Sequence, residues 1–537
     1  MLNALSCKEH PDVLEAHRLR EVQKGRLVTI GPTLPEAWKG SAYVSPIGII
    51  PKPHSKKFRC IFNLSSGGVC SINERIPQED GIVPFLSNKE IAQALAEAGA
   101  GAWLAAFDVE EAFRHLPVAP SDYRLLLLLI HGVYYVDTRV GFGSRTGPAN
   151  YQKFGAALAF LLEKSGLTLL RIIDDHLLIS TSRAGCAADV LRAHRLLAEL
   201  GVPRAPLKDF GPATWAIFNG LYWNCLTQRV GIAPTRLLEI IADLGALLAH
   251  APGARTWHLN ELRTTVGRLT SLLAVVPEGK AFLQACYAAS AEAVASLRQR
   301  TGRSASQREP KGSGLVAVKP NFAAIWEIRW WHDRLATGAS PTRAFAQVAL
   351  HGCQFVAPLP MRNQGPVTLS CDASGTALGA VWGNRWVRVP VTATFRLGRR
   401  AALHDRSRAQ PGRGRRSGST LLETAAILLA LATWGHQLAN TEVVILSDNS
   451  GAVAAWARLH SSHPVVAGFI RAAMALVLRH NIKLSVKWIA GATNVYADAV
   501  SRSKDELFRR LVRPRTPKQD RAPINPLTHP WWLPCTP

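Results

Sequence analysis

Three aspartates in the first half of the chain point most directly to chemistry. Asp108 ends a predicted strand just before a turn into a short helix, and Asp174 and Asp175 lie at the predicted tip of a hairpin. If the two strands are neighbours, the three carboxylates converge. Carboxylate oxygens suit Mg²⁺, and two ions about 3.5–4 Å apart stabilise both the attacking and the leaving oxygens of phosphoryl transfer. The predicted chemistry is nucleotidyl transfer, although an isolated Asp-Asp pair is also typical of a solvated turn.

Four acids in the second half form another set. Asp372 follows a predicted strand, Glu423 lies one turn into a helix, Asp448 ends a strand, and Asp498 opens a final helix. Each of them alone would more often cap a helix or lie on the surface. Delivered together by a mixed α/β unit, they fit a second two-metal site, here for hydrolysis of a phosphodiester.

Other residues near the first aspartates suit a nucleotide and a template. Lys52 and Arg59 belong to a basic hairpin whose cations would hold a triphosphate, and the ring of Phe113 would line a sugar pocket. A Gly-rich turn would let the backbone lie against a flat base or template at Gly143, Gly147 and Pro148.

Apolar periodicity and turn signals predict the elements that position these residues. In the first half we expect a hairpin over 41–65, strands over 103–109, 125–130 and 133–140, a helix over 151–162, strands on either side of 174–175, a helix over 189–201 and a strand pair within 215–235. Further on we expect helices over 236–300, a linker over 301–314, a Trp-rich helix around 326–331, strands over 367–382, 385–391 and 442–448, and helices over 421–438 and 452–459. A mixed α/β domain is the natural reading of the last part.

Composition limits the classes of function. The chain has 537 residues with 63 Lys and Arg against 38 Asp and Glu, a net charge of +25 that favours a polyanionic partner, nucleic acid above all. Hydrophobic residues make up 47%, enough for globular domains. No apolar run reaches the ~18 residues of a membrane span, and the N-terminus carries no secretory pattern. We therefore expect a soluble intracellular protein of the cytoplasm or nucleus.

Motif strings in the first half resemble those of reverse transcriptases. FDVEEAFRHLPV is similar to their first palm motif, GFGSRTGPANYQKF to the template grip, and RIIDDHLLIS to the x-x-D-D hairpin. GVPRAPLKDF and FNGLYW are similar to the Lys-containing palm loop and the primer grip. The motifs stand in the order of the family. Two positions depart from it, Ile172 before the Asp pair and Phe142 where retroviral enzymes have Gln.

The resemblance implies a role for each matching residue. Asp108, Asp174 and the carbonyl of Val109 would hold metal, and Asp175 would be the third carboxylate. Lys52 and Arg59 would contact the incoming triphosphate, Phe113 would exclude a ribose 2′-OH, and Lys208 would lie near the leaving pyrophosphate. The implied template and primer contacts are Phe142, Gly143, Gly147, Pro148, Gln152, Asn219 and Gly220.

The second half resembles ribonuclease H. DASGTALGA, LLETAA, LSDNSGAV and NVYADAVSR match its four motifs in order, which implies that Asp372, Glu423, Asp448 and Asp498 form its catalytic metal site. A His that many members place before the last Asp is absent, and Ala490 and Gly491 stand in that region. The order of the motifs is most similar to polyproteins of DIRS-like or gypsy-like retrotransposons.

These observations predict an α+β and α/β multidomain protein: a right-hand polymerase followed by a ribonuclease H-like domain. The expected parts are fingers and palm (1–225), a helical thumb (226–300), a linker with the Trp-rich helix (301–365), the ribonuclease H-like domain (366–502) and a basic Pro-rich tail (503–537). Residues 396–416 form a basic loop of unassigned role. Two Mg²⁺ ions per site are expected, with Mn²⁺ as the alternative.

The expected partners are an RNA template, a DNA primer, the RNA-DNA hybrid and dNTPs. The predicted activity is RNA-directed DNA synthesis with cleavage of RNA in the hybrid. Two alternatives stay open: a decayed or domesticated element that only binds nucleic acid, and an unrelated soluble α/β enzyme with surface acids.

Overall fold

A computed structural model describes residues 3–51, 58–67, 70–249, 256–301, 316–336, 340–353, 365–391, 416–512 and 516–522, with side chains from 420 onward in the helix that begins at 416. These residues form two compact units, unit 1 over 1–229 and unit 2 over 230–537. The predicted mixture of helices and sheets is confirmed. The finer division into five parts stays a prediction.

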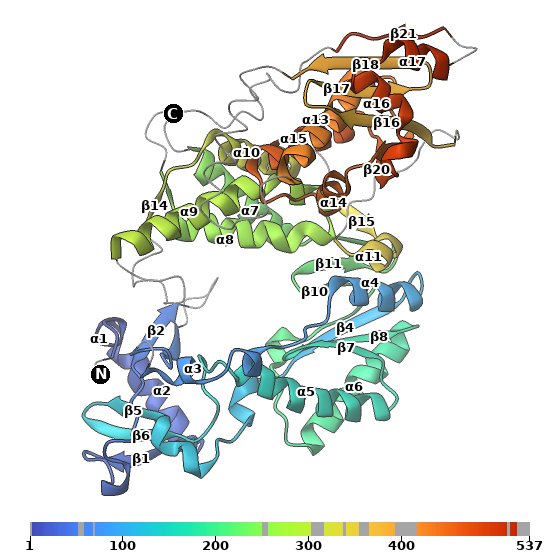
Figure 1. Cartoon of the computed structure of the whole chain (residues 1–537). Helices are drawn as coiled ribbons and strands as arrows, with labels where there is room; N and C mark the ends of the chain where they lie inside the picture. The colour runs from blue at the N-terminus through green and yellow to red at the C-terminus, as the bar shows by residue number, and fades with distance from the viewer. Residues whose placement is uncertain are drawn as a thin grey trace. The chain divides into compact units, whose positions relative to one another are not determined.

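A four-stranded antiparallel sheet carries the first group of acids in unit 1 (Figure 1). Its order is β7 (Leu169–Ile172), β8 (Asp175–Ser180), β4 (Trp103–Asp108) and β9 (Phe210–Ala213). Helices α5 (Gly147–Lys164) and α6 (Arg183–Glu199) pack beside it. The shared core contains Ala105, Phe107, Leu158, Leu162, Leu178, Cys186 and Leu197. Apolar residues on alternate strand positions and on one stripe of each helix build this layer.

The other elements of unit 1 come before, between and after the strands of this sheet along the chain. The chain begins with α1 (Ser6–Glu9), α2 (Pro11–Gln23), β1 (Leu27–Gly31), η1 (Glu36–Trp38), β2 (Ile47–Pro51), β3 (Phe58–Phe62), α3 (Ile72–Arg75), η3 (Glu79–Gly81) and α4 (Asn88–Glu97). After β4 come η4 (Ala112–His115), η5 (Pro120–Leu125), β5 (Leu127–Ile130) and β6 (Val133–Asp137), and after α6 come η6 (Pro206–Lys208), β10 (Trp215–Phe218) and β11 (Leu221–Asn224). Strands β1, β6 and β5 form a second sheet, β2 pairs with β3, and β10 pairs with β11.

Unit 2 contains a six-stranded mixed sheet in the order β20-β19-β16-β17-β18-β21. Its strands are β16 (Val367–Ala373), β17 (Ala377–Trp382), β18 (Arg385–Pro390), β19 (Glu442–Ser447), β20 (Lys483–Trp488) and β21 (Lys518–Gln519). β16 and β17 are antiparallel, whereas β16, β19 and β20 run parallel. Helix α13 (Arg416–Trp434) packs on β16, β17 and α15 (Pro464–Arg479), and α16 (Val495–Ser501) packs on β16 and β17.

Helices fill the rest of unit 2. They include α7 (Pro234–Ala249), α8 (Leu259–Ser271), α9 (Gln284–Thr301), α10 (Phe322–Ala336), α11 (Phe345–His351), α14 (Ser450–Arg458) and α17 (Asp505–Leu511). Shorter pieces are β12 (Arg229–Ile232), β13 (Trp257–His258), β14 (Ala317–Val318), β15 (Thr342–Ala344), η7 (Leu272–Ala274), η8 (Pro277–Phe282) and η10 (Gly491–Thr493). The Trp-rich helix is α10, where Trp331 is fully buried and donates its indole N–H to the Phe282 carbonyl.

The structure corrects several predicted boundaries. Helix α5 begins at Gly147, four residues before the predicted start, because Pro148 suits the first turn of a helix. No fold was predicted for the basic Pro-rich segment after 502, and the structure places α17 and β21 there, with β21 beside β18 in the sheet. Lys52, most of the linker and nearly all of the basic loop lie outside the described residues. Within the described part of the chain, no helix has the length and apolar character needed to cross a membrane.

Candidate active sites

Neighbouring strands bring the first three carboxylates together. β4 pairs antiparallel with β8 in a register that places Asp108 opposite Asp175. The β7–β8 hairpin closes through Ile173, which has a φ of 53°, and the carbonyl of Asp174 accepts a hydrogen bond from Val109 N–H at 3.1 Å. One carboxylate oxygen from each of Asp108, Asp174 and Asp175 lies within 4.8 Å of the other two. The predicted convergence is therefore present.

Electrostatics in this first cluster favour a bound cation. Burial and the neighbouring Asp108 charge raise the pKa of Asp174. Burial, a hydrogen bond with Asp108 and the charge of Asp174 raise the pKa of Asp175 to about 7, although its side chain still reaches solvent. Three crowded acids repel one another when all are ionised, and a divalent cation would remove this repulsion.

Lys208 partly neutralises the cluster. Its Nζ lies 2.6 Å from Asp108 Oδ2. Although partial burial lowers the pKa of Lys208, this hydrogen bond and the charges of Asp108, Asp174 and Asp175 together raise it. Asp108 Oδ1 is buried without a hydrogen-bond partner among the described residues. Buried carboxylate oxygens normally have partners, so this free oxygen marks a position where a cation fits.

A pocket of about 380 Å³ joins the cluster to the β10–β11 hairpin within unit 1. It is lined by Ala106, Phe107, Asp108, Asp175, His176, Lys208, Phe210, Trp215, Ile217, Phe218, Asn219 and Gly220. The pocket thus unites predicted metal, pyrophosphate and primer residues. Asn219 and Gly220, with φ values of 50° and 70°, form the turn of the hairpin, and Asn219 Nδ2 donates to Asn88 Oδ1 at 2.8 Å.

Arg59 and Phe113, two predicted nucleotide residues, both meet the ring of Phe142. The guanidinium of Arg59 lies 5.0 Å from the Phe142 ring centroid, and Phe113 contacts the same ring edge-to-face at 5.7 Å. Phe113 also meets Tyr151 edge-to-face at 5.8 Å. Phe142, which departs from the family pattern, therefore joins the strand that carries Arg59 to the segment that follows Asp108.

The predicted template residues lie around the start of α5. Gly143 has a φ of 114°, and a Cβ there would lie 2.4 Å from the Phe62 carbonyl oxygen, so only glycine fits. Gly147 and Pro148 form the first turn of α5, and Gln152 lies one turn further along it. Gln152 Nε2 donates a long 3.5 Å hydrogen bond to the Pro84 carbonyl.

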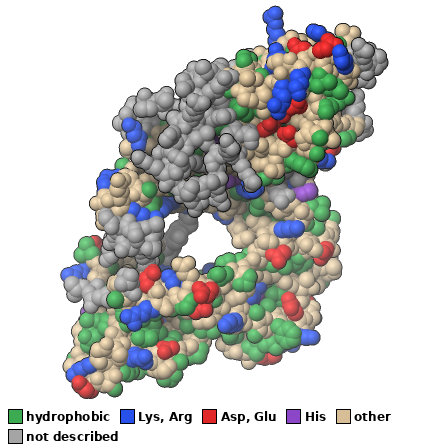
Figure 2. Space-filling model, in the orientation of Figure 1, with side chains coloured by type: hydrophobic (Ala, Val, Ile, Leu, Met, Phe, Trp, Pro, Cys, Tyr) green, Lys and Arg blue, Asp and Glu red, His purple; other side chains and the backbone are tan. Residues whose placement is uncertain are grey.

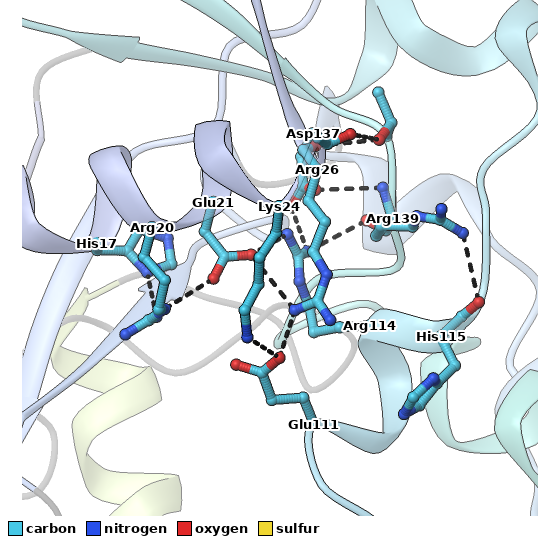
Figure 3. A network of polar contacts seen from close by, with 12 residues as sticks. His17, Arg20, Glu21, Lys24, Arg26, Glu111, Arg114, His115, Asp137 and Arg139 are labelled. Carbon is cyan, nitrogen blue, oxygen red and sulfur yellow. Dashed lines mark hydrogen bonds and ion pairs between the residues drawn. The ribbon is translucent and has the colours of Figure 1, made fainter. Parts of the chain in front are cut away.

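Several residues that the sequence did not single out support this site. His176 is fully buried, stacks on Phe107 at 4.6 Å, and its Nδ1 donates to the Asp174 carbonyl at 2.9 Å. Its position directly after the Asp pair was the only available signal. Arg114 is buried between Glu21 and Asp137 (Figure 3). Glu21 lies 87 positions before Asp108, so no local pattern could have revealed it.

The second cluster lies in unit 2 at the ends of β16 and β19. Asp372, Glu423 and Asp448 place one carboxylate oxygen each within 4.8 Å of the others. Glu423 is 4% exposed and accepts hydrogen bonds from Ala373 N–H at 3.1 Å and Ser447 Oγ–H at 3.4 Å. Burial and the charges of Asp372 and Asp448 raise the pKa of Glu423 to about 9.

Asp372 is equally buried and has a partner from another element. Burial raises its pKa, and its Oδ2 accepts a hydrogen bond from the Ser501 hydroxyl on α16. Helix α16 can approach because β17 carries Gly379, where a Cβ would lie 2.8 Å from Ser501 N. Gly491 stands in the region where ribonucleases H that resemble this sequence have a His. A Cβ at Gly491 would lie 3.0 Å from Asp448 Oδ2, so the backbone here lies close to the Asp448 carboxylate.

Asp498 is not brought into this three-carboxylate group. Its Oδ1 pairs with Arg502 Nε, and its Oδ2 lies 3.2 Å from Lys504 Nζ. These two cations outweigh partial burial and lower the pKa of Asp498. Asp498 lies in α16, the helix that delivers Ser501 to Asp372, while its own carboxylate is paired with Arg502 and Lys504. Its role as a ligand stays a prediction.

Comparison with solved structures finds the foamy viral protease-reverse transcriptase, each time over 91% of this chain. Its dRH form with double-stranded DNA matches at 13% identity and a TM-score of 0.45 over 70% of that chain. The complex with an RNA/DNA hybrid matches at 12% identity and a TM-score of 0.45, over 54% of that chain. A further complex with double-stranded DNA matches at 12% identity and a TM-score of 0.43, over 85% of that chain. No protein-family model and no curated protein matches the chain. Function must therefore be argued from the side chains themselves.

Proposed function

We propose that this protein is an RNA-directed DNA polymerase with ribonuclease H activity on RNA-DNA hybrids. The observation that carries the proposal is that the chain assembles two separate carboxylate clusters, one per unit, each with three ligand oxygens within 4.8 Å. Their residues come from the motif strings that resemble the two enzyme families. Both proposed reactions, DNA synthesis and RNA cleavage, act on nucleic acid, and the net charge of +25 suits binding of such a polyanion.

In the proposed polymerase site, Asp108, Asp174 and Asp175 hold Mg²⁺, with Mn²⁺ as the alternative. When bound, the metal would supply Lewis acidity for nucleotidyl transfer. Lys208 lies at the pocket wall, where its ammonium binds anionic phosphate oxygens and donates hydrogen bonds to them. Arg59 and Lys52 bind the triphosphate of a dNTP. The Phe113 ring restricts the sugar pocket and so favours 2′-deoxyribose.

The template and primer lie in the proposed complex against Phe142, Gly143, Gly147, Pro148 and Gln152, and against Asn219 and Gly220. The last two line the pocket that holds Asp108, which suits a primer end. The Val109 carbonyl would complete the metal coordination. These contacts address backbone and sugar more than base edges, so synthesis depends little on template sequence.

In the proposed nuclease site, Asp372, Glu423 and Asp448 hold the metal, and Asp498 joins them when its ion pairs open. Glu423, whose pKa is about 9, would have to bind the metal as the ionised carboxylate. Arg502 and Lys504 then become free to bind phosphates of the hybrid. An origin in a DIRS-like or gypsy-like retrotransposon and an intracellular location complete the proposal.

Primer extension with Mg²⁺ on an RNA template tests the polymerase half. Asp174→Asn should lower dNTP incorporation by a factor on the order of 10³ or more, because it removes a metal-binding charge. Asp122→Asn, which changes an exposed aspartate in η5, is the matched control and should leave extension unchanged.

Cleavage of a labelled RNA-DNA hybrid tests the nuclease half in the same preparation. Glu423→Gln should abolish cleavage while Asp174→Asn leaves it intact. If the unmodified chain neither extends nor cleaves but binds the hybrid tightly, the proposal fails. The protein is then a catalytically decayed or domesticated nucleic-acid binder.

A further inference from the structure

The turn between Asp108 and Phe113 has an unusual backbone. Glu111 has a φ of 53° and precedes the single helical turn η4, which carries Phe113 and Arg114. Non-glycine residues adopt this left-handed conformation rarely, and it persists where surrounding contacts hold it in place. The side chains that bind Glu111 come from the first 26 residues of the chain.

The carboxylate of Glu111 is bound by two cations from the region where α2 ends and β1 begins. Lys24 Nζ lies 2.8 Å and Arg26 Nη1 2.5 Å from Glu111 Oε2 (Figure 3). These two contacts tie the turn that carries Glu111 to the segment between α2 and β1.

On the other side of Phe113, Arg114 forms a buried bridge. Its two terminal nitrogens lie 2.9 Å from Glu21 Oε2 and 2.7 Å from Asp137 Oδ2, and the three side chains are 5%, 2% and 4% exposed. Figure 3 shows the guanidinium between α2 and the end of β6. Because the guanidinium is planar and each carboxylate binds it in a fixed direction, the two ion pairs restrict the position of the Arg114 side chain and backbone.

Phe113 lies between these two anchored residues. Its ring is half-buried against Phe142 and Tyr151, in contacts that are directional but weak. We propose that Glu21, Lys24 and Arg26 are positioning residues that fix the backbone carrying Phe113, and so set how strictly the polymerase site excludes ribonucleotides. We call the contacts of Glu21, Lys24 and Arg26 with Glu111 and Arg114 the clamp. The role of Phe113 in this inference rests on the proposed function, whereas the clamp itself is a property of the fold.

The clamp predicts a specific kinetic effect. Loosening the turn would let the Phe113 ring withdraw from the sugar, because its aromatic contacts alone allow several orientations. The ratio of kcat/KM for rNTPs to that for dNTPs should then rise about tenfold, with a higher KM for dNTPs and a smaller change in kcat. A purely structural role would lower activity on both substrates equally.

Two variants of the full chain test this inference by different routes. Lys24→Gln with Arg26→Gln releases Glu111 and leaves Arg114 in place. Glu21→Leu with Arg114→Met and Asp137→Leu replaces the buried ions by apolar groups, a change that often preserves stability. The matched control is Arg18→Gln, which breaks the Arg18–Glu15 pair on the same helix α2 away from the turn.

Hydrogen exchange at the backbone amides of positions 114 and 116 is the first measurement, since both amides donate within this turn. We expect exchange at least about tenfold faster in both variants, unchanged exchange in β4, and no change in the control. Unchanged exchange at these amides in both variants would overturn the inference, whether or not the chain is catalytic.

The substrate ratio is the second measurement. A tenfold rise in both variants, absent from Arg18→Gln, supports positioning of Phe113. Faster exchange with an unchanged ratio overturns it. If the unmodified chain extends no primer, the proposed function fails, and the exchange result alone then decides whether the clamp exists.

Discussion

At the scale of the residue, Glu423 would make metal binding at the second carboxylate cluster depend on pH. Its carboxyl is buried beside Asp372 and Asp448, and its pKa of about 9 lies far above the ~4.3 of a free glutamate. The folded, metal-free protein therefore binds a proton at Glu423 more tightly than the unfolded chain does. This contribution to stability is complete below about pH 4 and disappears as the pH rises through about 9.

Thermal unfolding with EDTA should show this dependence. The Tm should fall between pH 5 and pH 9, and Mg²⁺ should raise the Tm more at pH 8.5 than at pH 5.5, because metal binding needs the ionised carboxylate. Glu423→Gln should flatten the decline. Glu506→Gln, which changes a 65% exposed residue on α17, is the control. An equal Mg²⁺ effect at both pH values would contradict the prediction.

Asp498 offers a second test at the scale of one residue. Its pairs with Arg502 and Lys504 are half-exposed and so contribute at most about 1 kcal/mol each, yet they compete with any metal for the same carboxylate. Arg502→Gln should tighten Mn²⁺ binding to the substrate-free protein by up to about fivefold, measured by calorimetry.

The control for this variant is an exposed Arg–Glu ion pair elsewhere in unit 2. Arg509 lies 3.8 Å from Glu506 on α17, and Arg509→Gln should leave Mn²⁺ affinity unchanged. Weaker binding in Arg502→Gln would mean that Arg502 supports the metal site rather than competing with it.

At the scale of elements, a buried ion pair joins three helices of unit 2. Glu327 on α10 is fully buried and accepts hydrogen bonds from Ala285 N–H and Cys286 N–H, both at 3.0 Å, at the N-terminus of α9. Arg471 on α15 lies 3.2 Å from the same carboxylate. α15 packs on α13, which carries Glu423, so helices before residue 340 are tied to the second carboxylate site.

Breaking this pair should loosen all three helices together. Glu327→Gln leaves Arg471 buried without its counter-ion and should cost about 3 kcal/mol or more. Hydrogen exchange of the α9, α10 and α15 amides in the full chain measures the opening free energy. Glu292→Gln, at an exposed position of α9, should change it by less than about 0.5 kcal/mol. Faster exchange confined to α10 would contradict the coupling.

At the scale of the whole molecule, charge would govern the proposed binding of nucleic acid. Lys and Arg outnumber Asp and Glu by 63 to 38, and on the face drawn in Figure 2 the basic side chains are scattered over the described surface rather than gathered in one patch. Dispersed cations suit contact with a phosphate backbone along its length, and such contact releases counter-ions.

Hybrid binding should therefore weaken steeply with salt and depend little on sequence. If about six to ten phosphates are neutralised, log K should fall against log salt with a slope of roughly −5 to −9. Titrations of two hybrids with unrelated sequences should give Kd values that agree within about threefold. A slope shallower than about −2 would contradict an interface formed mainly with the phosphates of the hybrid.

Many of the strands and helices, and the elements that carry most of the acidic site residues, could be predicted from local sequence. The strand that ends at Asp108, the strand that ends just before Asp448, the hairpin at Asp174 and the helix of Glu423 follow from short apolar runs and turn residues. Backbone preference and side-chain periodicity act over a few residues. The boundaries were less accurate. The start of α5 and the last strand β21 depend on neighbours rather than on their own sequence, and β21 has only two residues.

The sequence by itself determined which acids exist, which strand or helix bears each, and the strongly basic balance of the chain. Only the tertiary structure decided which carboxylates meet: it groups Asp372, Glu423 and Asp448 and directs Asp498 to Arg502. It also decided that Glu21 reaches Arg114 across 93 positions. The reason is physical. Periodicity records how a segment is oriented locally, whereas burial, pKa and ion pairing depend on which distant segments pack together.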